Sequence, residues 1–364
     1  MTLAAWLHDF SPIALRLGPL TVRWYGLSYL AGFAGGWLLL RWLARRGVVR
    51  IAPQRVADAI LLIIVGVVVG GRLGYVLLYR PSLLWSFTPD LPWWGALAIH
   101  EGGMASHGGM IGVVIAAWLI ARGPADDDGV RHDAVPVRHV LDAMCLIGPL
   151  GLFFGRIANF VNGELLGRIV ADPGAPAPWW AVRFPQELVE NEAPVLTGEQ
   201  ARALQALIDA VRRPGDSDGA ALDRLIAAVQ AGVPGIGEQL APVLAARHPS
   251  QLYQAAAEGV VVGAVVWFVG RRPRVPGVVG CWFLISYGVL RVVTEFWRLP
   301  DAHLMTKRPL GLSRGQWLSL VMVAVGLAIL VKLVRSREPR LGGWATTRPP
   351  VGGDTPPRSA DRER

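Results

Sequence analysis

The sequence predicts an all-α polytopic membrane protein, and three observations support this fold class. Hydrophobic residues make up 52% of the 364 residues and charged residues only 17%, a balance typical of membrane proteins rather than soluble domains. The chain holds seven apolar runs, each close to the roughly 20 residues that a helix needs to cross a bilayer. Many of the 15 tryptophans fall near the ends of these runs, where interfacial tryptophans gather.

We expect one transmembrane helix in each run. The predicted spans are Val22–Trp42, Val56–Tyr79, Ala96–Ala121, Val137–Phe160, Gln251–Val269, Val275–Glu295 and Gly315–Val334. The segment before them lacks a basic region followed by an apolar core, so it does not resemble a cleavable signal peptide.

The basic residues of the short loops predict the orientation. Arginines and one lysine cluster after the first, fifth and seventh runs, and such clusters mark the cytoplasmic side. With seven spans all three clusters fall on one side, which puts the N-terminus outside and the C-terminus inside. Lys307 and Arg308 lie on the outer side, against the rule.

The domain organisation follows from this topology. Residues 1–335 form the predicted membrane domain, and residues 168–247 form a periplasmic helical insertion within it. Thr197 and Gln200 have the spacing of a capping box, and two amphipathic helices follow, separated by Pro214 and Gly215. Residues 336–364, rich in Pro, Gly and Arg, are predicted to be a disordered cytoplasmic tail.

The formal net charge of +9 does not indicate nucleic-acid binding. The arginines lie in short loops and in the tail, so topology accounts for most of the excess. Cys145 and Cys281 both lie in predicted spans without metal spacing, and we expect them to be small core residues.

The most informative motif follows the fourth run, in residues 155–168. Arg156, Asn159 and Gly163 share one helix face. Charged side chains inside a membrane are costly and are kept where something pairs with them, and an anionic lipid headgroup is one candidate. The glycine predicts a gap beside the polar side chains where a ligand can approach.

Other polar blocks interrupt the remaining runs, and each has a structural alternative. Residues 23–26 also fit an interfacial anchor. Arg72 also fits a structural ion pair. His107 directly precedes Gly108 and Gly112, whose spacing is that of a small-residue face in contact with another helix. Arg291 and Glu295, four residues apart on one face, also fit mutual neutralisation.

Soluble cofactor sites are missing from the sequence. It has no phosphate-binding loop and no His-Glu-x-x-His or Cys-x-x-Cys metal spacing, and it lacks the paired-aspartate pattern of CDP-alcohol phosphotransferases. ATP-driven transport and metal-dependent hydrolysis are therefore disfavoured, and no cofactor is expected.

The run from Gly155 to Arg168 resembles the signature of the prolipoprotein diacylglyceryl transferase family. Five other segments resemble family blocks in the same order: 23–26, 71–75, 107–112, 248–253 and 291–301. The resemblance covers most of residues 20–335. It implies transfer of the diacylglyceryl group from phosphatidylglycerol to the lipobox cysteine of a preprolipoprotein, in the bacterial inner membrane.

The resemblance also implies roles for individual residues. His107 is expected to help remove the thiol proton, while Arg156 and Arg291, with Asn159, hold the phosphate and headgroup. The residues expected to position the substrate are Tyr25, Arg72, Asn162, Glu164, Gly167 and Glu295. The expected partners are phosphatidylglycerol, lipobox signal peptides and membrane lipids, without nucleic acid.

The sequence departs from the family at Gln254, where members commonly carry glutamate. An amide can only hydrogen-bond, so a carboxylate role at this position is not assigned to Gln254. The outer segment is also longer than usual in the family.

Two other classes of function compete with the transferase. A lipid or anion transporter would also bury arginines, but it needs a polar path to both faces. A structural scaffold leaves Arg72, Arg156 and Arg291 unexplained unless each of them is paired.

Overall fold

The computed structural model describes residues 5–18, 20–89, 91–99, 102–123, 134–190, 192–299 and 311–344. The chain divides into two compact units. Unit 1 consists of Met1–Gly35, Ile147–Val265 and Cys281–Ile329, and unit 2 of Gly36–Leu146, Val266–Gly280 and Leu330–Arg364.

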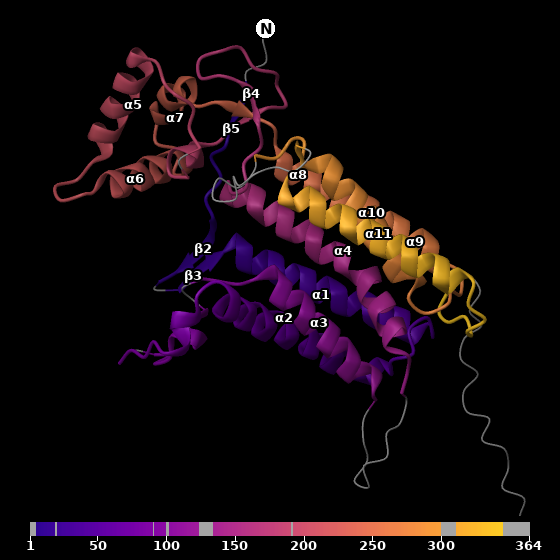
Figure 1. Ribbon diagram of the computed structural model, residues 1–364. Helices are drawn as coiled ribbons and strands as arrows, with labels where there is room; N and C mark the ends of the chain where they lie inside the picture. The colour runs from indigo at the N-terminus through magenta and orange to yellow at the C-terminus, as the bar shows by residue number, and fades with distance from the viewer. Residues whose placement is uncertain are drawn as a thin grey trace, which may run out of the picture. The chain divides into compact units, whose positions relative to one another are not determined.

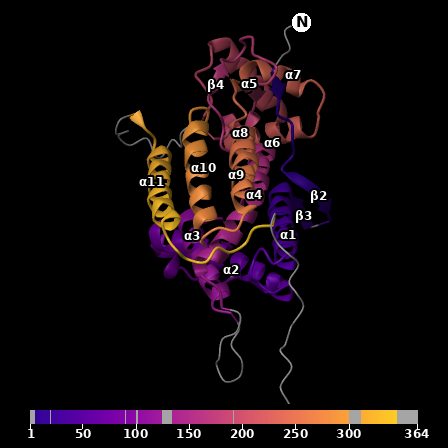
Figure 2. The ribbon, with the colours of Figure 1, turned by 90° about the vertical axis from the view of Figure 1, so that its right-hand side faces the viewer.

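Long helices make up most of unit 1. They are the first half of α1 (Trp24–Arg45), most of α4 (Val137–Asn162), and most of α10 (Val278–Thr294) and α11 (Arg314–Val334). Unit 1 also holds α8 (Ser250–Gln254), the π-helix η7 (Ala255–Val261) and the beginning of α9 (Val262–Gly270), which form one continuous helical stretch. Glycines allow neighbouring helices to pack closely: a Cβ at Gly259 would lie 2.6 Å from the Cβ of Phe153, and one at Gly288 would lie 2.7 Å from Val323. Figure 2 shows α10 and α11 side by side.

A small head precedes α8 in unit 1. Its four-stranded sheet has the order β1 (Trp6–Leu7), β5 (Val182–Arg183), β6 (Ala246–Arg247), β4 (Ile169–Ala171), in which only the β1–β5 pair is parallel. The helices α5 (Gly198–Val211), α6 (Asp218–Gln230) and α7 (Ile236–Leu240) and the 3₁₀ turns η5 (Pro185–Leu188) and η6 (Ala241–Val243) complete it (Figure 1). Their shared core includes Leu207, Ile208, Leu225, Val229, Leu240 and Leu244.

The two predicted amphipathic helices of the insertion are present as α5 and α6. The Thr197 hydroxyl accepts from the Gln200 backbone N–H at 3.3 Å, and the Gln200 side-chain oxygen accepts from the Thr197 N–H at 2.9 Å. This is the predicted capping box. The predicted all-α class missed the head sheet and the hairpin of β2 (Ile13–Leu17) and β3 (Leu20–Arg23), because strands of two to five residues have too little alternation to detect.

In unit 2, α2 (Val56–Leu78) and α3 (Ser106–Ala121) form an antiparallel pair at very close range (Figure 1). A Cβ at Gly70 would lie 2.4 Å from the Gly108 carbonyl oxygen, and one at Gly66 would lie 2.5 Å from that of Gly112. Such contacts need glycine on both helices, as in membrane helix pairs. Short 3₁₀ turns flank the pair: η1 (Pro53–Arg55), η2 (Pro81–Leu84) and η3 (Gly95–Leu97).

Within the described residues, four helices are long and apolar enough to cross a membrane: Pro53–Leu78, Val137–Asn162, Ser250–Gly270 and Gly315–Val334. Two shorter apolar helices, His107–Ala121 and Val278–Thr294, accompany them. The chain is therefore mostly helical, as a polytopic membrane protein is. Helix α1 is 22 residues long but is outside this group of four, so the number of seven spans stays a prediction.

The predicted span Ala96–Ala121 starts too early. Helix α3 begins only at Ser106, and Gly102 and Gly103 have φ of +84° and +81°, values that a right-handed helix excludes. The predicted tail begins at residue 336, but Leu341 bridges Arg274 and the Trp344 ring lies 4.7 Å from that of Trp267. Residues 345–364, like Lys307 and Arg308, lie outside the described residues.

Candidate functional site

The polar side chains of unit 1 meet around a carboxylate that the sequence analysis missed, Glu258. It lies in the π-helix η7, and its side chain is wholly buried. Its Oε2 accepts from the Nε of Arg156 on α4 at 2.9 Å, and its Oε1 lies 3.9 Å from the Nε of Arg291 on α10. One carboxylate therefore stands between the two arginines predicted to be catalytic.

Arg291 has a second acidic partner. Its Nη1 donates to Glu295 one turn later, so the predicted pairing along α10 is present. Glu295 also accepts from the Ser313 hydroxyl at 2.9 Å and lies 3.9 Å from Arg298. The network holds three guanidiniums and two carboxylates, so its net charge is positive and it favours an anion.

Glu164, just beyond α4, is held by amides. Its carboxylate accepts from the Nδ2 of Asn159 at 3.2 Å and from that of Asn162 at 3.0 Å. Its backbone oxygen accepts from the buried Gln251 side chain at 2.6 Å. The turn after α4 depends on Gly163, whose φ is +69°, a value that glycine adopts most readily. The structure therefore brings three predicted site residues, Asn159, Asn162 and Glu164, into one cluster.

The gap predicted beside Gly163 is not open. A Cβ there would lie 2.3 Å from the Cδ of Gln186, so the Gln186 amide occupies this space. The prediction was wrong because it considered only the residues of the helix face. The Gln186 side chain of the head packs against that face at Gly163.

Gly167 is required by a close backbone approach. A Cβ at this position would lie 2.0 Å from the His248 carbonyl oxygen. Gly167 also forms an isolated bridge with Arg298, which links the segment after α4 to the segment after α10. Any side chain here would push these two segments of the site apart.

Tyr25 is the second residue of α1 and is half-buried. Its ring centroid lies 5.2 Å from that of Tyr29, and Tyr29 interacts with both Tyr25 and Glu164. Tyr25 therefore belongs to the surroundings of the Glu164 cluster.

The remaining two predicted site residues, Arg72 and His107, lie in unit 2. The guanidinium of Arg72 donates to four backbone carbonyls: Ala96 at 2.8 Å, Gly95 at 2.7 Å, Gly102 at 2.5 Å and Gly103 at 3.1 Å. These hydrogen-bond acceptors all belong to the segment that leads into α3, and the guanidinium also lies over the Tyr75 ring at 5.7 Å from its centroid. These bonds also explain why residues 102–105 are not helical.

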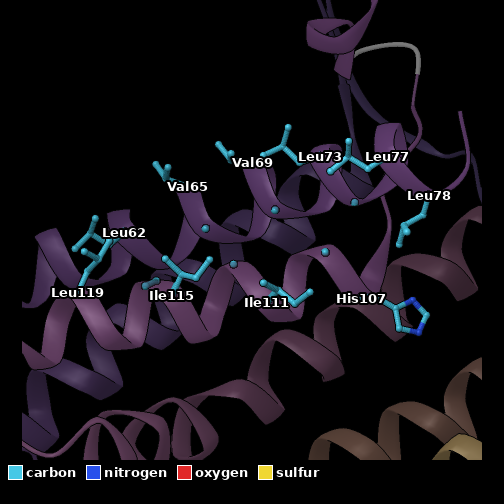
Figure 3. Close-up of a pocket in the computed structure, with 16 residues that line it drawn as sticks. Leu62, Val65, Val69, Leu73, Leu77, Leu78, His107, Ile111, Ile115 and Leu119 are labelled. Carbon is cyan, nitrogen blue, oxygen red and sulfur yellow. The ribbon is translucent and has the colours of Figure 1, made fainter. Parts of the chain in front are cut away.

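His107, the second residue of α3, is exposed. It stands at one end of an apolar groove of about 470 Å³ between α2 and α3. Figure 3 shows the leucine, isoleucine and valine side chains along the groove, with the His107 ring as the nitrogen-bearing group at its end. A titratable imidazole at the end of an apolar surface suits proton transfer beside a lipid.

The sequence contained one signal for Glu258. It is the single acidic residue of the apolar stretch Ser250–Gly270, and an ionisable residue inside such a stretch indicates a functional site. A second missed feature is the buried pair of Arg247 with Glu187, whose Nε–Oε2 distance is 2.6 Å. The sequence offers no comparable signal for that pair.

Comparisons with known proteins identify the family of this chain. The family profile described as prolipoprotein diacylglyceryl transferase matches residues 12–332. Relatives named phosphatidylglycerol–prolipoprotein diacylglyceryl transferase include one from Bdellovibrio bacteriovorus, which is 42% identical over 359 residues (93% of this chain and 97% of the relative). Others are from Neisseria gonorrhoeae, 38% identical over 91% of this chain and 98% of the relative, and Chromobacterium violaceum, 35% identical over the same shares. The chain therefore belongs to the prolipoprotein diacylglyceryl transferase family.

Proposed function

We propose that this protein transfers the diacylglyceryl group of phosphatidylglycerol to the lipobox cysteine of preprolipoproteins. The names of its relatives contain the donor lipid and the acceptor protein. The observation that carries the proposal is the arginine pair: Arg156 and Arg291 share the buried Glu258 within an apolar helical unit. Guanidiniums bind phosphate oxygens in pairs of hydrogen bonds, and the lipid phosphate is the expected anion.

The reaction makes one bond and breaks one. The cysteine thiolate attacks the glycerol carbon that carries the phosphate ester, a C–S bond forms and the C–O bond to the phosphate breaks. The products are a thioether-linked diacylglyceryl protein and glycerol phosphate. Negative charge gathers on the leaving phosphate, so Arg156 and Arg291 would stabilise it where it develops.

His107 would take the thiol proton. A thiol has an ordinary pKa of about 8.5 and is largely protonated at neutral pH. Asn159 would help Arg156 and Arg291 to hold the phosphate and headgroup. Asn162 and Glu164 would orient the substrate with Tyr25, and Glu295 would orient Arg291. We give Arg72 no contact with substrate, because its donors are directed to backbone carbonyls.

The membrane setting is part of the proposal. Seven spans, with the N-terminus and the head in the periplasm and the C-terminus in the cytoplasm of a bacterial inner membrane, fit the arginines of the short loops. Both substrates are lipid-embedded, so each would reach the site sideways from the bilayer.

The test uses purified protein in detergent with phosphatidylglycerol and a lipobox peptide. Peptide mass and release of glycerol phosphate are followed together. A diacylglyceryl mass gain that is lost when the peptide cysteine is alanine supports the transferase. Binding of phosphatidylglycerol without any mass gain would instead support a lipid carrier.

A further inference from the structure

We propose that Glu258 is a positioning residue that fixes Arg156 and Arg291 relative to each other so that they can stabilise the leaving phosphate. This inference rests on the proposed function, because it assigns Glu258 a role through the two arginines. Three elements of unit 1 meet at this point: Arg156 comes from α4, Glu258 from η7 and Arg291 from α10.

The burial of Glu258 shows that it is not a surface counter-ion. None of its side chain is exposed, whereas 18% of the Arg156 side chain and 12% of the Arg291 side chain are. A carboxylate is removed from water only at a cost of several kcal/mol, which paired cations must offset. The buried Glu258 carboxylate is therefore stable only while Arg156 and Arg291 stay beside it. The carboxylate in turn restricts where the two guanidiniums can lie.

The geometry leaves the arginines able to hold a phosphate. The bond from Arg156 uses its Nε, so this carboxylate does not occupy the terminal nitrogens of that guanidinium. The Nη1 of Arg291 donates to Glu295, and the Nε of Arg291 lies 3.9 Å from the Oε1 of Glu258. Orienting a guanidinium through its Nε fixes the plane of the group, and thereby the direction of its remaining donors.

The second oxygen of Glu258 supports a bridging role. Oε1 is buried and has no hydrogen-bond partner among the described residues, and it lies 3.9 Å from the Nε of Arg291. A movement of Arg291 by about 1 Å would bring the two atoms to hydrogen-bond distance. The carboxylate would then be bonded to both arginines, as a phosphate between them would require.

Gln254 makes the role specific to Glu258 in this chain. It lies four residues earlier and is also buried, but it is neutral, and its Nε2 has no partner among the described residues. Glu258 is therefore the negative charge that this helical stretch contributes to the arginines.

Four variants test the inference in the phosphatidylglycerol–peptide assay: Glu258→Gln, Glu258→Asp, Gln254→Glu and the double variant Gln254→Glu/Glu258→Gln. Glu258→Gln keeps the shape and removes the charge. We expect kcat to fall by about 10- to 100-fold, since an error of about 1 Å in positioning has effects of this size. We expect KM for phosphatidylglycerol to change less than threefold, and Glu258→Asp to retain more activity than Glu258→Gln.

The double variant has the same number of charged residues as the wild type. It therefore separates a loss of activity caused by the displaced carboxylate from a loss caused by a folding defect. If Glu258 acts through its position, the double variant unfolds at the wild-type temperature but stays slow, while Gln254→Glu alone remains active. Recovery of the wild-type kcat in the double variant would overturn the inference. A Glu258→Gln variant with wild-type kcat would do the same.

Arg156→Ala and Arg291→Ala separate this inference from the proposed function. If both lose activity while Glu258→Gln stays active, only the positioning role fails. If both retain wild-type activity, the arginine site and the positioning role fail together. The matched control is Glu338→Gln, which removes an exposed carboxylate paired with Arg138 in unit 2 and should leave kcat unchanged.

Discussion

The Nε of Arg247 lies 2.6 Å from the Oε2 of Glu187, and both side chains are wholly buried. Arg247 also donates to the carbonyls of Gly167 at 3.1 Å and Glu192 at 2.5 Å, while Glu187 accepts from the Ala245 N–H at 2.9 Å. The pair thus connects the head sheet to the segment that follows the Glu164 cluster. This buried ion pair is one of the contacts that connect the head to the candidate site.

Glu187→Gln should lower the free energy of unfolding by about 3–5 kcal/mol, because it leaves the Arg247 charge buried without its counter-ion. Thermal unfolding in detergent measures the loss. Replacing both residues by apolar ones of similar volume should cost less than the single change. An unchanged Tm in Glu187→Gln would contradict the stabilising role of Glu187 as the counter-ion of Arg247.

His8 should make the packing of β1 sensitive to acid. Its Nε2 donates to the Phe160 carbonyl at 2.7 Å, near the end of α4, and its ring is surrounded by Trp6, Phe10 and Phe184. Burial lowers the pKa of His8 below its ordinary value. The folded state therefore prefers the neutral ring, and its stability is complete above about pH 6.5 and falls as the pH drops through that value.

The measurement is Tm between pH 5 and 8 for wild type and His8→Gln. Glutamine can still donate to the Phe160 carbonyl but does not titrate. We expect the wild type to lose Tm below pH 6.5 more steeply than the variant. Parallel curves would show that His8 does not contribute to the acid sensitivity.

The predictable part of the fold consists of segments with strong local signals. The runs from Val56 and Val137 predicted helices because long apolar stretches leave few other structures, and the capping box at Thr197 predicted the start of α5. The early start assigned to the third span failed for a tertiary reason. The composition of residues 96–105 is that of a span, but the carbonyls of this segment bind Arg72 instead of continuing a helix.

The candidate site likewise has a part that local sequence signals predict and a part that only the folded structure brings together. Asn159, Asn162 and Glu164 are close in sequence, and their contact follows from the end of one helix. Glu258 is 102 residues from Arg156, and no local pattern links them. The apolar sequence of this stretch also gives no sign of the π-helix that carries Glu258, or of the close packing of Gly259 against Phe153.

Arg72→Lys should loosen the segment between α2 and α3. Lysine has a point-like ammonium and cannot reach four carbonyls in the planar geometry of arginine, so buried carbonyls would lose partners at roughly 1–3 kcal/mol each. We expect faster proteolysis within residues 81–105. Arg80→Lys, at an exposed position just after α2, is the control. Equal cleavage rates in the two variants would argue against the clamp.

The α2–α3 contact should tolerate no side chain at Gly108. A Cβ there would lie 2.1 Å from the Gly70 carbonyl oxygen, whereas one at the neighbouring Gly109 would lie 3.6 Å from the nearest atom. Gly108→Ala should therefore lower the free energy of unfolding by about 1–3 kcal/mol, as overpacking does. Gly109→Ala should be neutral or slightly stabilising, because alanine favours the helix. Equal Tm values for both variants would contradict the close contact.

His107→Gln should slow the transfer most at neutral pH, if His107 takes the thiol proton. Without a base, the reaction depends on thiolate already present in the peptide, and that fraction rises towards the thiol pKa of about 8.5. The ratio of variant to wild-type kcat should therefore increase between pH 7 and pH 9. The Cys→Ala peptide sets the background at each pH, and Tm at both limits verifies that the variant is folded. A constant ratio would mean that the deficit arises from lost binding or packing at the end of the groove. The imidazole would then be removed from the proton-transfer step, while the roles proposed for Arg156 and Arg291 would stand.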